Sequence, residues 1–238
     1  HSTSLVAMVG GGTSSLRPGE ISLATNGVLF LDELGEFAPS VLDALRQPLE
    51  EGVVRVARAK FSVQLPAKFL LVAATNPCPC GEGTPGLCVC DDRAKQKYLR
   101  RFSGPLLDRF DLRVAVTRPH VDELLAAKPA ESSKDIALRV ATARELAISR
   151  NGCLNSALSA DALEKCAPLS PAAASLLRHH VERGRLSGRG YHRIRRVART
   201  VSDLRDQSEC VDEVHVAVAL ALRVGVQPQF SGDRVAQS

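Results

Sequence analysis

Two short apolar runs, each ended by polar residues, constrain the fold of this chain more than any other feature. The first covers residues 28–31, VLFL, and is followed by the acidic pair Asp32 and Glu33. The second covers residues 69–74, FLLVAA, and is followed by a Thr-Asn pair and a proline. Continuous apolar runs of this length are typical of strands that are buried on both faces of a parallel sheet. Polar residues at the carboxyl ends of such strands indicate a binding site at that edge of the sheet.

Patterns around these runs complete the prediction of an α/β fold. A single helix is expected over residues 39–52, where apolar residues recur at helical spacing and a glycine ends the pattern. Residues 53–65 alternate between apolar and polar, which predicts a β-hairpin. A third strand is expected over residues 112–116, whereas residues 1–19, rich in Gly, Ser and Thr, are expected to form a loop. Strands separated by helices favour a mainly parallel sheet.

The composition changes beyond about residue 129 to Ala, Leu, Arg and Glu at helical spacing, which predicts an all-helical second domain. Ser159 and Ser170, the latter followed by a proline, are typical of capped helix starts. The predicted organisation is an α/β domain over residues 1–128, a helical domain over residues 129–230 and a polar tail over residues 231–238.

Charge, hydropathy and cysteine content narrow the class of protein. The formal net charge of +5, from 31 basic and 26 acidic residues, is too small to establish a nucleic-acid partner by itself. No apolar run approaches the roughly 18 residues that a membrane span needs, and the chain does not start with a signal-peptide pattern. An odd number of cysteines, partly clustered, indicates a reducing compartment rather than a disulfide framework. We therefore expect a cytoplasmic protein with no membrane partner.

The polar residues after the two apolar runs are suited to magnesium binding and hydrolysis. Magnesium in phosphate sites is held by few protein oxygens, and a carboxylate at a strand end, here Asp32, is well placed to supply one. The adjacent Glu33 points in a different direction and can polarise a water for attack on a terminal phosphate. The amide of Asn76 can hydrogen-bond a water or a phosphate oxygen without adding charge. The alternatives are a solvated acidic turn and an asparagine that only forms a turn.

Arg109 lies in the sequence GPLLDRFDL, just before the expected third strand. An arginine that reaches the phosphates of a neighbouring subunit stabilises charge only in an assembled ring. The alternative for Arg109 is an ordinary ion pair with Asp108 or Asp111.

A cluster of arginines falls on a helix that is predicted from about Ser187 to Asp206. An apolar stripe along one side of this helix leaves Arg193, Arg195 and Arg199 to face elsewhere, where some of them could follow a phosphate backbone. A solvated helix face is the alternative. The residues of the stripe are Ile194, Val197, Val201 and Leu204.

Four of the cysteines form two Cys-x-Cys pairs that flank a glycine-rich segment. Four thiolates in this arrangement can close a tetrahedral zinc site, and the alternative is four free thiols in a flexible loop. Loss of such a metal should loosen the loop after Asn76 and disturb that residue. The candidate zinc ligands are Cys78, Cys80, Cys88 and Cys90.

Three motifs in this order, GVLFLDE, FLLVAATNP and LLDRFDL, resemble AAA+ ATPases of the magnesium chelatase branch, most closely the bacterial ComM/YifB-type proteins. The resemblance covers nearly the whole chain, including GVVRVARAKFSVQLPAKF and LSGRGYHRIRRVARTVSDL. It implies a partial AAA+ core of the P-loop type, followed by a helical lid domain, with ATP and Mg²⁺ as cofactors. It also implies a hexameric ring of identical subunits that couples ATP hydrolysis to work on DNA, in the manner of a branch-migration helicase.

The resemblance assigns the functional positions of the family to residues of this chain. The Walker B pair falls on Asp32 and Glu33, the first sensor on Asn76, the arginine finger on Arg109 and the second sensor on Arg189. The nucleotide is then contacted by Asp32, Asn76 and Arg189.

The basic hairpin is the expected contact for DNA. In the related ring motors a hairpin before the first-sensor strand points into the central pore, so Arg55, Arg58 and Lys60 would lie where a phosphate backbone passes. The alternative is an exposed turn whose charges only favour solubility.

The Walker A loop of the family, a glycine-rich turn that cradles phosphates, does not occur in the sequence given. Gly10, Gly11 and Gly12 do not replace it, because no lysine follows them and no apolar strand precedes them. We therefore expect the chain alone to bind ATP weakly or not at all.

Three functions are consistent with these observations. The first is a part of a DNA-acting ATPase motor that is inactive on its own. The second is a metal-insertion ATPase subunit like that of magnesium chelatase itself. The third is a non-catalytic module for DNA binding or oligomerisation.

Overall fold

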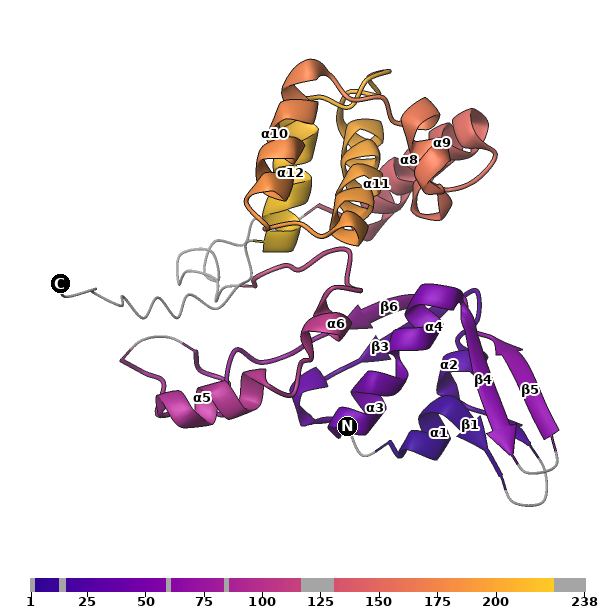
Figure 1. Ribbon diagram of the computed structural model, residues 1–238, viewed down its shortest axis with the longest axis vertical. Coiled ribbons are helices and arrows are strands. Elements are labelled where there is room, and N and C mark those ends of the chain that lie inside the picture. The colour runs from indigo at the N-terminus through magenta and orange to yellow at the C-terminus, as the bar shows by residue number, and fades with distance from the viewer. Residues whose placement is uncertain (1–2, 13–15, 59–60, 84–85, 117–130, 225–238) are drawn as a thin grey trace. The chain divides into compact units, whose positions relative to one another are not determined.

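The computed structural model divides into two compact units, His1–Phe110 and Asp111–Ser238, and in Figure 1 the first runs from indigo to magenta and the second from magenta through orange to yellow. The predicted domain boundary at residues 128 and 129 and the predicted tail lie outside the described residues. The residues that the structure describes are 3–12, 16–58, 61–83, 86–116 and 131–224.

The first unit has the predicted α/β composition, with short helices, three pairs of strands and one apolar core. Its strands are β1 (Gly10–Gly11), β2 (Arg17–Pro18), β3 (Val28–Leu31), β4 (Val53–Arg58), β5 (Phe61–Pro66) and β6 (Leu70–Ala73). Its helices are α1 (Leu5–Val9), α2 (Glu20–Leu23), the 3-10 helix η1 (Leu34–Glu36), α3 (Pro39–Ala44), α4 (Arg46–Glu51), α5 (Asp92–Leu99) and α6 (Gly104–Leu107).

The two apolar runs pair as parallel strands, which confirms the prediction of a parallel sheet. Strand β3 lies beside β6 in a register that places Leu31 opposite Ala73. Leu31 is 5% exposed and lies in the core, whereas Phe30, on the other face of the strand, is 58% exposed. The expectation of burial on both faces is therefore wrong for this unit, because none of its own described elements covers the outer face of this pair.

The single helix predicted over residues 39–52 is in fact two helices that meet at Leu45. The cause is Pro48, which has no N–H to donate and whose ring clashes with the carbonyl group four residues earlier, at Ala44. The predicted end is confirmed, since Gly52 adopts the left-handed conformation with φ of 67° and terminates α4.

The predicted hairpin is confirmed as β4 and β5, which pair antiparallel from Val53 opposite Pro66 to Arg58 opposite Phe61. Val54 and Val56 face the core and are 2% and 6% exposed. The side chain of Arg55 lies on the opposite side of the strand and is 54% exposed.

The expected loop at residues 1–19 instead contains a helix and a pair of short strands. The side chain of Ser4 accepts a hydrogen bond from the N–H of Ala7 and so starts α1, which places Met8 in the core with 1% exposure. Strand β1 then pairs with β2. A single helical turn leaves too few apolar positions for periodicity to reveal it.

The third strand predicted over residues 112–116 is wrong, since these residues form an irregular segment. The segment has no strand partner among the described residues, and Leu112, Val114 and Val116 are each at least half exposed. The N–H of Arg113 instead donates to the carbonyl of Leu222 in the second unit. Apolar alternation alone does not produce a strand when no neighbouring strand pairs with it.

The second unit is helical, as predicted, and has its own core. Ser159 and Ser170 cap the helices that follow them, and Ser187 caps the arginine-rich helix, which confirms these predicted starts. Its helices are α8 (Ser133–Asn151), the 3-10 helix η2 (Asn155–Ala157), α9 (Ala160–Cys166), α10 (Pro171–Glu182), α11 (Gly188–Arg205) and α12 (Glu213–Val224).

Of the helices that the structure describes, none combines the length and the apolar character that crossing a bilayer requires.

Candidate functional site

The parallel strands bring the predicted catalytic residues to one edge of the sheet. The N–H of Ala74 donates to the carbonyl of Leu31 at 2.9 Å, and the N–H of Leu34 donates to the carbonyl of Ala74 at 2.8 Å. These two bonds hold the chain after β3 against the chain after β6. Asp32 and Glu33 therefore lie on the strand end next to the one that carries Asn76.

The acidic pair adopts an unusual backbone conformation. Glu33 has φ of 52° and ψ of 47°, the left-handed region, which costs a residue with a Cβ about 1–2 kcal/mol. The Oδ1 atom of Asp32 accepts a hydrogen bond from the N–H of Glu33 at 2.9 Å and supports this turn. Both side chains are exposed. Strain of this kind is often found at functional sites.

The donor set at this edge fits magnesium and an attacking water. Exposed carboxylate oxygens at a strand end are hard ligands of the type that Mg²⁺ binds, usually with waters completing its shell. Asp32 supplies such oxygens, and Glu33 supplies a second carboxylate beside it. The side chain of Asn76 is exposed as well and offers a neutral donor and acceptor.

Helix α5 fixes the turn that follows the acidic pair. The hydroxyl groups of Tyr98 and Thr75 lie 3.0 Å apart, and Tyr98 is only 5% exposed. A Cβ atom on Gly35 would overlap the hydroxyl end of Tyr98. The guanidinium of Arg101 donates to the carbonyl of Gly35. Sequence patterns did not single out Tyr98 or Gly35, because their roles depend on contacts between distant segments.

The four clustered cysteines converge, as the zinc prediction requires. Their sulfur atoms all lie within 4.8 Å of one another. The Sγ atom of Cys78 lies 3.3 Å from that of Cys80 and 3.6 Å from that of Cys88, and Cys80 and Cys88 are 3.7 Å apart. All are free thiols, so no disulfide competes for them. The two Cys-x-Cys pairs therefore form one cluster with metal-ligand spacing.

Two thiols of this cluster have pKa values that are shifted in opposite directions. A hydrogen bond from the backbone of Glu82, with a further one from Cys78, lowers the pKa of Cys80 to about 6. Loss of hydration raises the pKa of Cys90 to about 12. Hydrogen bonds of this kind to a sulfur atom favour the thiolate, the form in which cysteine binds metals.

Arg109 is held within its own unit. Its Nε donates to the carbonyl of Arg46 at 3.0 Å and its Nη1 to the carbonyl of Pro105 at 2.6 Å. Its Nη2 pairs with the carboxylate of Glu50, and the side chain is only 12% exposed. The intramolecular ion pair of Arg109 thus includes Glu50 on α4.

The hairpin residues predicted to bind DNA are described in part. Arg55 forms an exposed ion pair with Glu51, one helical turn away in sequence, with 2.6 Å between Nη1 and Oε2. The side chain of Arg58 and the whole of Lys60 lie outside the described residues.

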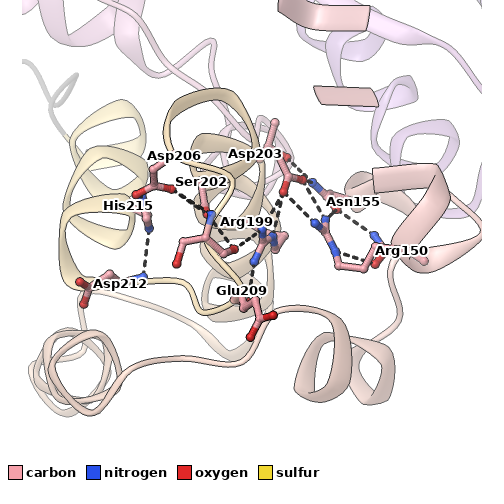
Figure 2. A network of polar contacts seen from close by, with 12 residues as sticks. Arg150, Asn155, Arg199, Ser202, Asp203, Asp206, Glu209, Asp212 and His215 are labelled. Atoms are coloured by element: carbon pink, nitrogen blue, oxygen red, sulfur yellow. Dashed lines mark hydrogen bonds and ion pairs between the residues drawn. The ribbon is translucent and has the colours of Figure 1, made fainter. Parts of the chain in front are cut away.

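Arg189, the predicted second sensor, lies exposed in the first turn of α11 in the helical unit. The same helix is anchored by a buried ionic network, shown in Figure 2. Asp203 accepts from Nη1 and Nη2 of Arg150, both at 2.8 Å, and from the amide of Asn155 at 2.7 Å. Arg199 donates to the same carboxylate at 2.7 Å, and both residues of that pair are 1% exposed.

The prediction that Arg195 and Arg199 follow a phosphate backbone is wrong, since both are 1% exposed. Arg195 donates to the carbonyls of Leu163 and Ala167, both at 3.0 Å, near the end of α9. Cations are favoured where the carbonyl groups of a helix end have no internal partner. Burial of an arginine needs such partners, and they come from segments that the helix pattern alone does not identify.

A second part of the network joins α11 to α12. The Nδ1 atom of His215 accepts from the N–H of Asp212 at 3.0 Å, and its Nε2 lies 3.1 Å from a carboxylate oxygen of Asp206 (Figure 2). The side chain of His215 is 1% exposed. This histidine therefore has a structural role in the helical unit.

Comparison with known proteins identifies relatives for both units. The family model for magnesium chelatase, subunit ChlI, matches residues 1–124, and the model for the C-terminal part of subunit ChlI matches residues 130–223.

Three curated proteins are similar over nearly the whole chain. Competence protein ComM of Haemophilus influenzae is 43% identical over 228 residues, which cover 95% of this chain and 44% of that protein. An uncharacterized protein of Mycobacterium tuberculosis is 45% identical over 228 residues, which cover 94% of this chain and 45% of that protein. The uncharacterized protein YifB of Escherichia coli is 42% identical over 224 residues, which cover 94% of this chain and 44% of that protein. The chain thus spans less than half the length of these relatives.

Proposed function

The chain belongs to the magnesium chelatase family, of the ComM and YifB type, and from this premise we propose that it is part of a ring-forming, ATP-hydrolysing motor that acts on DNA. The observation that carries the proposal is the convergence of Asp32, Glu33 and Asn76 at one edge of a parallel sheet. This is the place where sheets of this type bind nucleotides.

Each residue of this edge has a role in hydrolysis. Asp32 holds Mg²⁺, which would neutralise charge on the phosphates of ATP when bound. Glu33, the second exposed carboxylate at this strand end, accepts a proton from the attacking water. Asn76 hydrogen-bonds the water or the terminal phosphate and distinguishes the triphosphate from the product. Arg189 contacts the nucleotide as the second sensor.

Arg109 acts across the interface of the hexameric ring. In the free chain its guanidinium pairs with Glu50. In the ring it exchanges this carboxylate for the phosphates of the neighbouring subunit, because a phosphate carries more negative charge and accepts the same bidentate geometry. The exchange links hydrolysis to assembly.

DNA is the proposed substrate of the motor, and the hairpin its contact. The resemblance to the ComM/YifB type supports this choice, as do the basic residues Arg55, Arg58 and Lys60 in the β4–β5 hairpin. Insertion of magnesium into a cofactor is the second candidate, since the description of both family models is that of a magnesium chelatase subunit. A non-catalytic module is the third.

Zinc is the proposed second metal, held by Cys78, Cys80, Cys88 and Cys90. The separations among the sulfur atoms of Cys78, Cys80 and Cys88, 3.3 to 3.7 Å, are close to the roughly 3.8 Å edge of a tetrahedron with Zn–S bonds of about 2.3 Å, and the sulfur of Cys90 lies within 4.8 Å of them. The free thiols and the proposed motor function are consistent with a cytoplasmic location.

The test is the ATPase rate of a full-length protein that carries this region, measured with and without DNA. Glu33→Gln should abolish turnover and leave ATP bound, because it removes the proton acceptor and keeps the shape of the side chain. Glu20→Gln, an exposed charge loss in the same unit, is the matched control. Turnover unaffected by Glu33→Gln contradicts the assignment, and hydrolysis that DNA does not stimulate favours the second candidate.

A further inference from the structure

We propose that the cysteine cluster is a metal-locked clamp that positions Asn76. The proposal rests on the proposed function only in taking Asn76 as the sensor of the nucleotide. The clamp itself is a property of this chain that is measurable without ATP. Its parts are the two Cys-x-Cys pairs, two glycines between them and the hydroxyl pair of Thr75 and Tyr98.

The cysteine loop folds back onto the residues that precede it. An ideal Cβ atom on Gly81 would lie 3.7 to 3.8 Å from the three terminal atoms of the Asn76 side chain, so the amide lies directly over this glycine. A Cβ atom on Gly83 would overlap the ring of Pro77. The loop therefore packs against Asn76 and against the residue after it.

The turn that carries this packing is part of the metal site. The N–H of Gly81 donates to the carbonyl of Cys78 at 3.0 Å, and Gly81 has φ of 80°, which favours glycine. Cys78 and Cys80 lie within this turn, and Cys78 is 2% exposed. A metal bound to both sulfur atoms fixes the turn, and with it the surface on which Asn76 rests.

The other end of the loop is anchored to the same strand end. Asp91, directly after Cys90, accepts from the N–H of Ala94 at 2.6 Å and caps helix α5. That helix places the hydroxyl of Tyr98 at 3.0 Å from that of Thr75. The loop thus leaves the strand end at Asn76 and returns to Thr75, so that closing it with a metal restrains the sensor from both sides.

A bound metal adds to the contacts that stabilise this clamp. Without it, the thiol contacts, the hydrogen bond of the Gly81 turn and the packing of Gly83 on Pro77 hold the loop against the loss of chain entropy. Because the four ligands come together only when the loop is ordered, the free energy of metal binding contributes to the order of the loop. We expect side chains that contact the metal-binding cysteines to change position when the metal is removed. Asn76 is such a group, since it lies against the turn that holds two of the ligands.

The experiment combines metal analysis with NMR of the whole chain. Protein purified without chelators should contain one zinc per chain, and Cys80→Ser should lower this content by at least tenfold. Cys210→Ser, which changes an exposed cysteine outside the cluster, should leave it unchanged. The side-chain amide signals of Asn76, assigned through Asn76→Asp, should shift or broaden when zinc is removed. Those of Asn155, in the helical unit, should not.

A second variant separates the clamp from the metal. Gly83→Ala keeps every thiol but forces the loop away from Pro77, so it should move the Asn76 signals while zinc stays bound. The clamp is overturned if zinc is bound but the Asn76 signals change neither when zinc is removed nor in the Gly83→Ala variant. Absence of zinc, or iron in its place, overturns the assignment of the metal. Neither result depends on ATP hydrolysis, so neither affects the roles proposed for Asp32 and Glu33.

Discussion

Replacement of Asp203 by asparagine should destabilise the helical unit strongly. The carboxylate of Asp203 accepts five hydrogen bonds: two from Arg150, two from Arg199 and one from Asn155. The amide of the variant would keep the shape but carry no charge and turn two N–H donors toward the same groups. Arg199 is 1% exposed, so water cannot compensate it. Removing one partner of a buried ion pair costs about 3–5 kcal/mol.

Hydrogen exchange of α11, measured by mass spectrometry on the whole chain, is the appropriate assay, because it reports on the helical unit separately. Each 1.4 kcal/mol changes the equilibrium constant for opening tenfold, so the protection of α11 against exchange should fall roughly a hundredfold to a few thousandfold. Asp161→Asn makes the same chemical change at an exposed position of α9 and should alter protection by only a few tenths of a kcal/mol. Peptides from the α/β unit serve as the internal reference.

Two results would refute this reasoning. If Asp203→Asn lowers protection no more than Asp161→Asn does, the network contributes no stability despite its burial. If the loss is equally large in the α/β unit, the effect is global and does not arise from the contacts around Asp203.

Three further predictions concern pH, packing and DNA. Burial alone would raise the pKa of Asp203, but hydrogen bonds from its partners outweigh it and hold the pKa below 3.8. The stabilisation that ionised Asp203 contributes is therefore complete above pH 3.8 and is lost as the pH falls through the lower pKa of the folded state. Urea unfolding of the helical unit across this pH range should show the loss of stability, whereas the Asp203→Asn variant should show no such loss. Gly35→Ala should destabilise the α/β unit by about 1–3 kcal/mol in urea unfolding, because its methyl group overlaps Tyr98, whereas with Tyr98→Phe the loss should be smaller. In a full-length ring, Arg58→Ala with Lys60→Ala should weaken DNA binding and lower the slope of its salt dependence by about one for each lost phosphate contact; unchanged affinity and slope would exclude the hairpin from DNA binding.

Local sequence signals predicted much of the fold. The caps at Ser159, Ser170 and Ser187 mark helix starts because a side-chain oxygen satisfies a backbone N–H nearby in sequence. The β4–β5 hairpin follows from alternation, and the pairing of β3 with β6 follows from two equivalent apolar runs. The break at Leu45 was not predicted, although Pro48 disfavours a continuous helix there.

The remaining features depend on contacts between distant segments. The exposure of Phe30 is set by what covers its face of the sheet, which the apolar run does not encode. Arg109 pairs with Glu50, and Arg199 is buried against Asp203, through partners that helical periodicity does not select. At the candidate site, residue types predicted Asp32, Glu33 and Asn76. The supporting contact of Tyr98 with Thr75 became apparent only from the structure.

The burial of Tyr98 makes the chain suitable for optical measurements. The sequence contains two tyrosines and no tryptophan, so near-ultraviolet absorption and fluorescence come mainly from one chromophore in each unit. Tyr98 reports on the hydroxyl contact with Thr75, and Tyr191 lies with its ring 5.6 Å from the guanidinium carbon of Arg195. With either tyrosine replaced by phenylalanine, the emission of the other follows a single unit during folding or ligand binding, without an added dye.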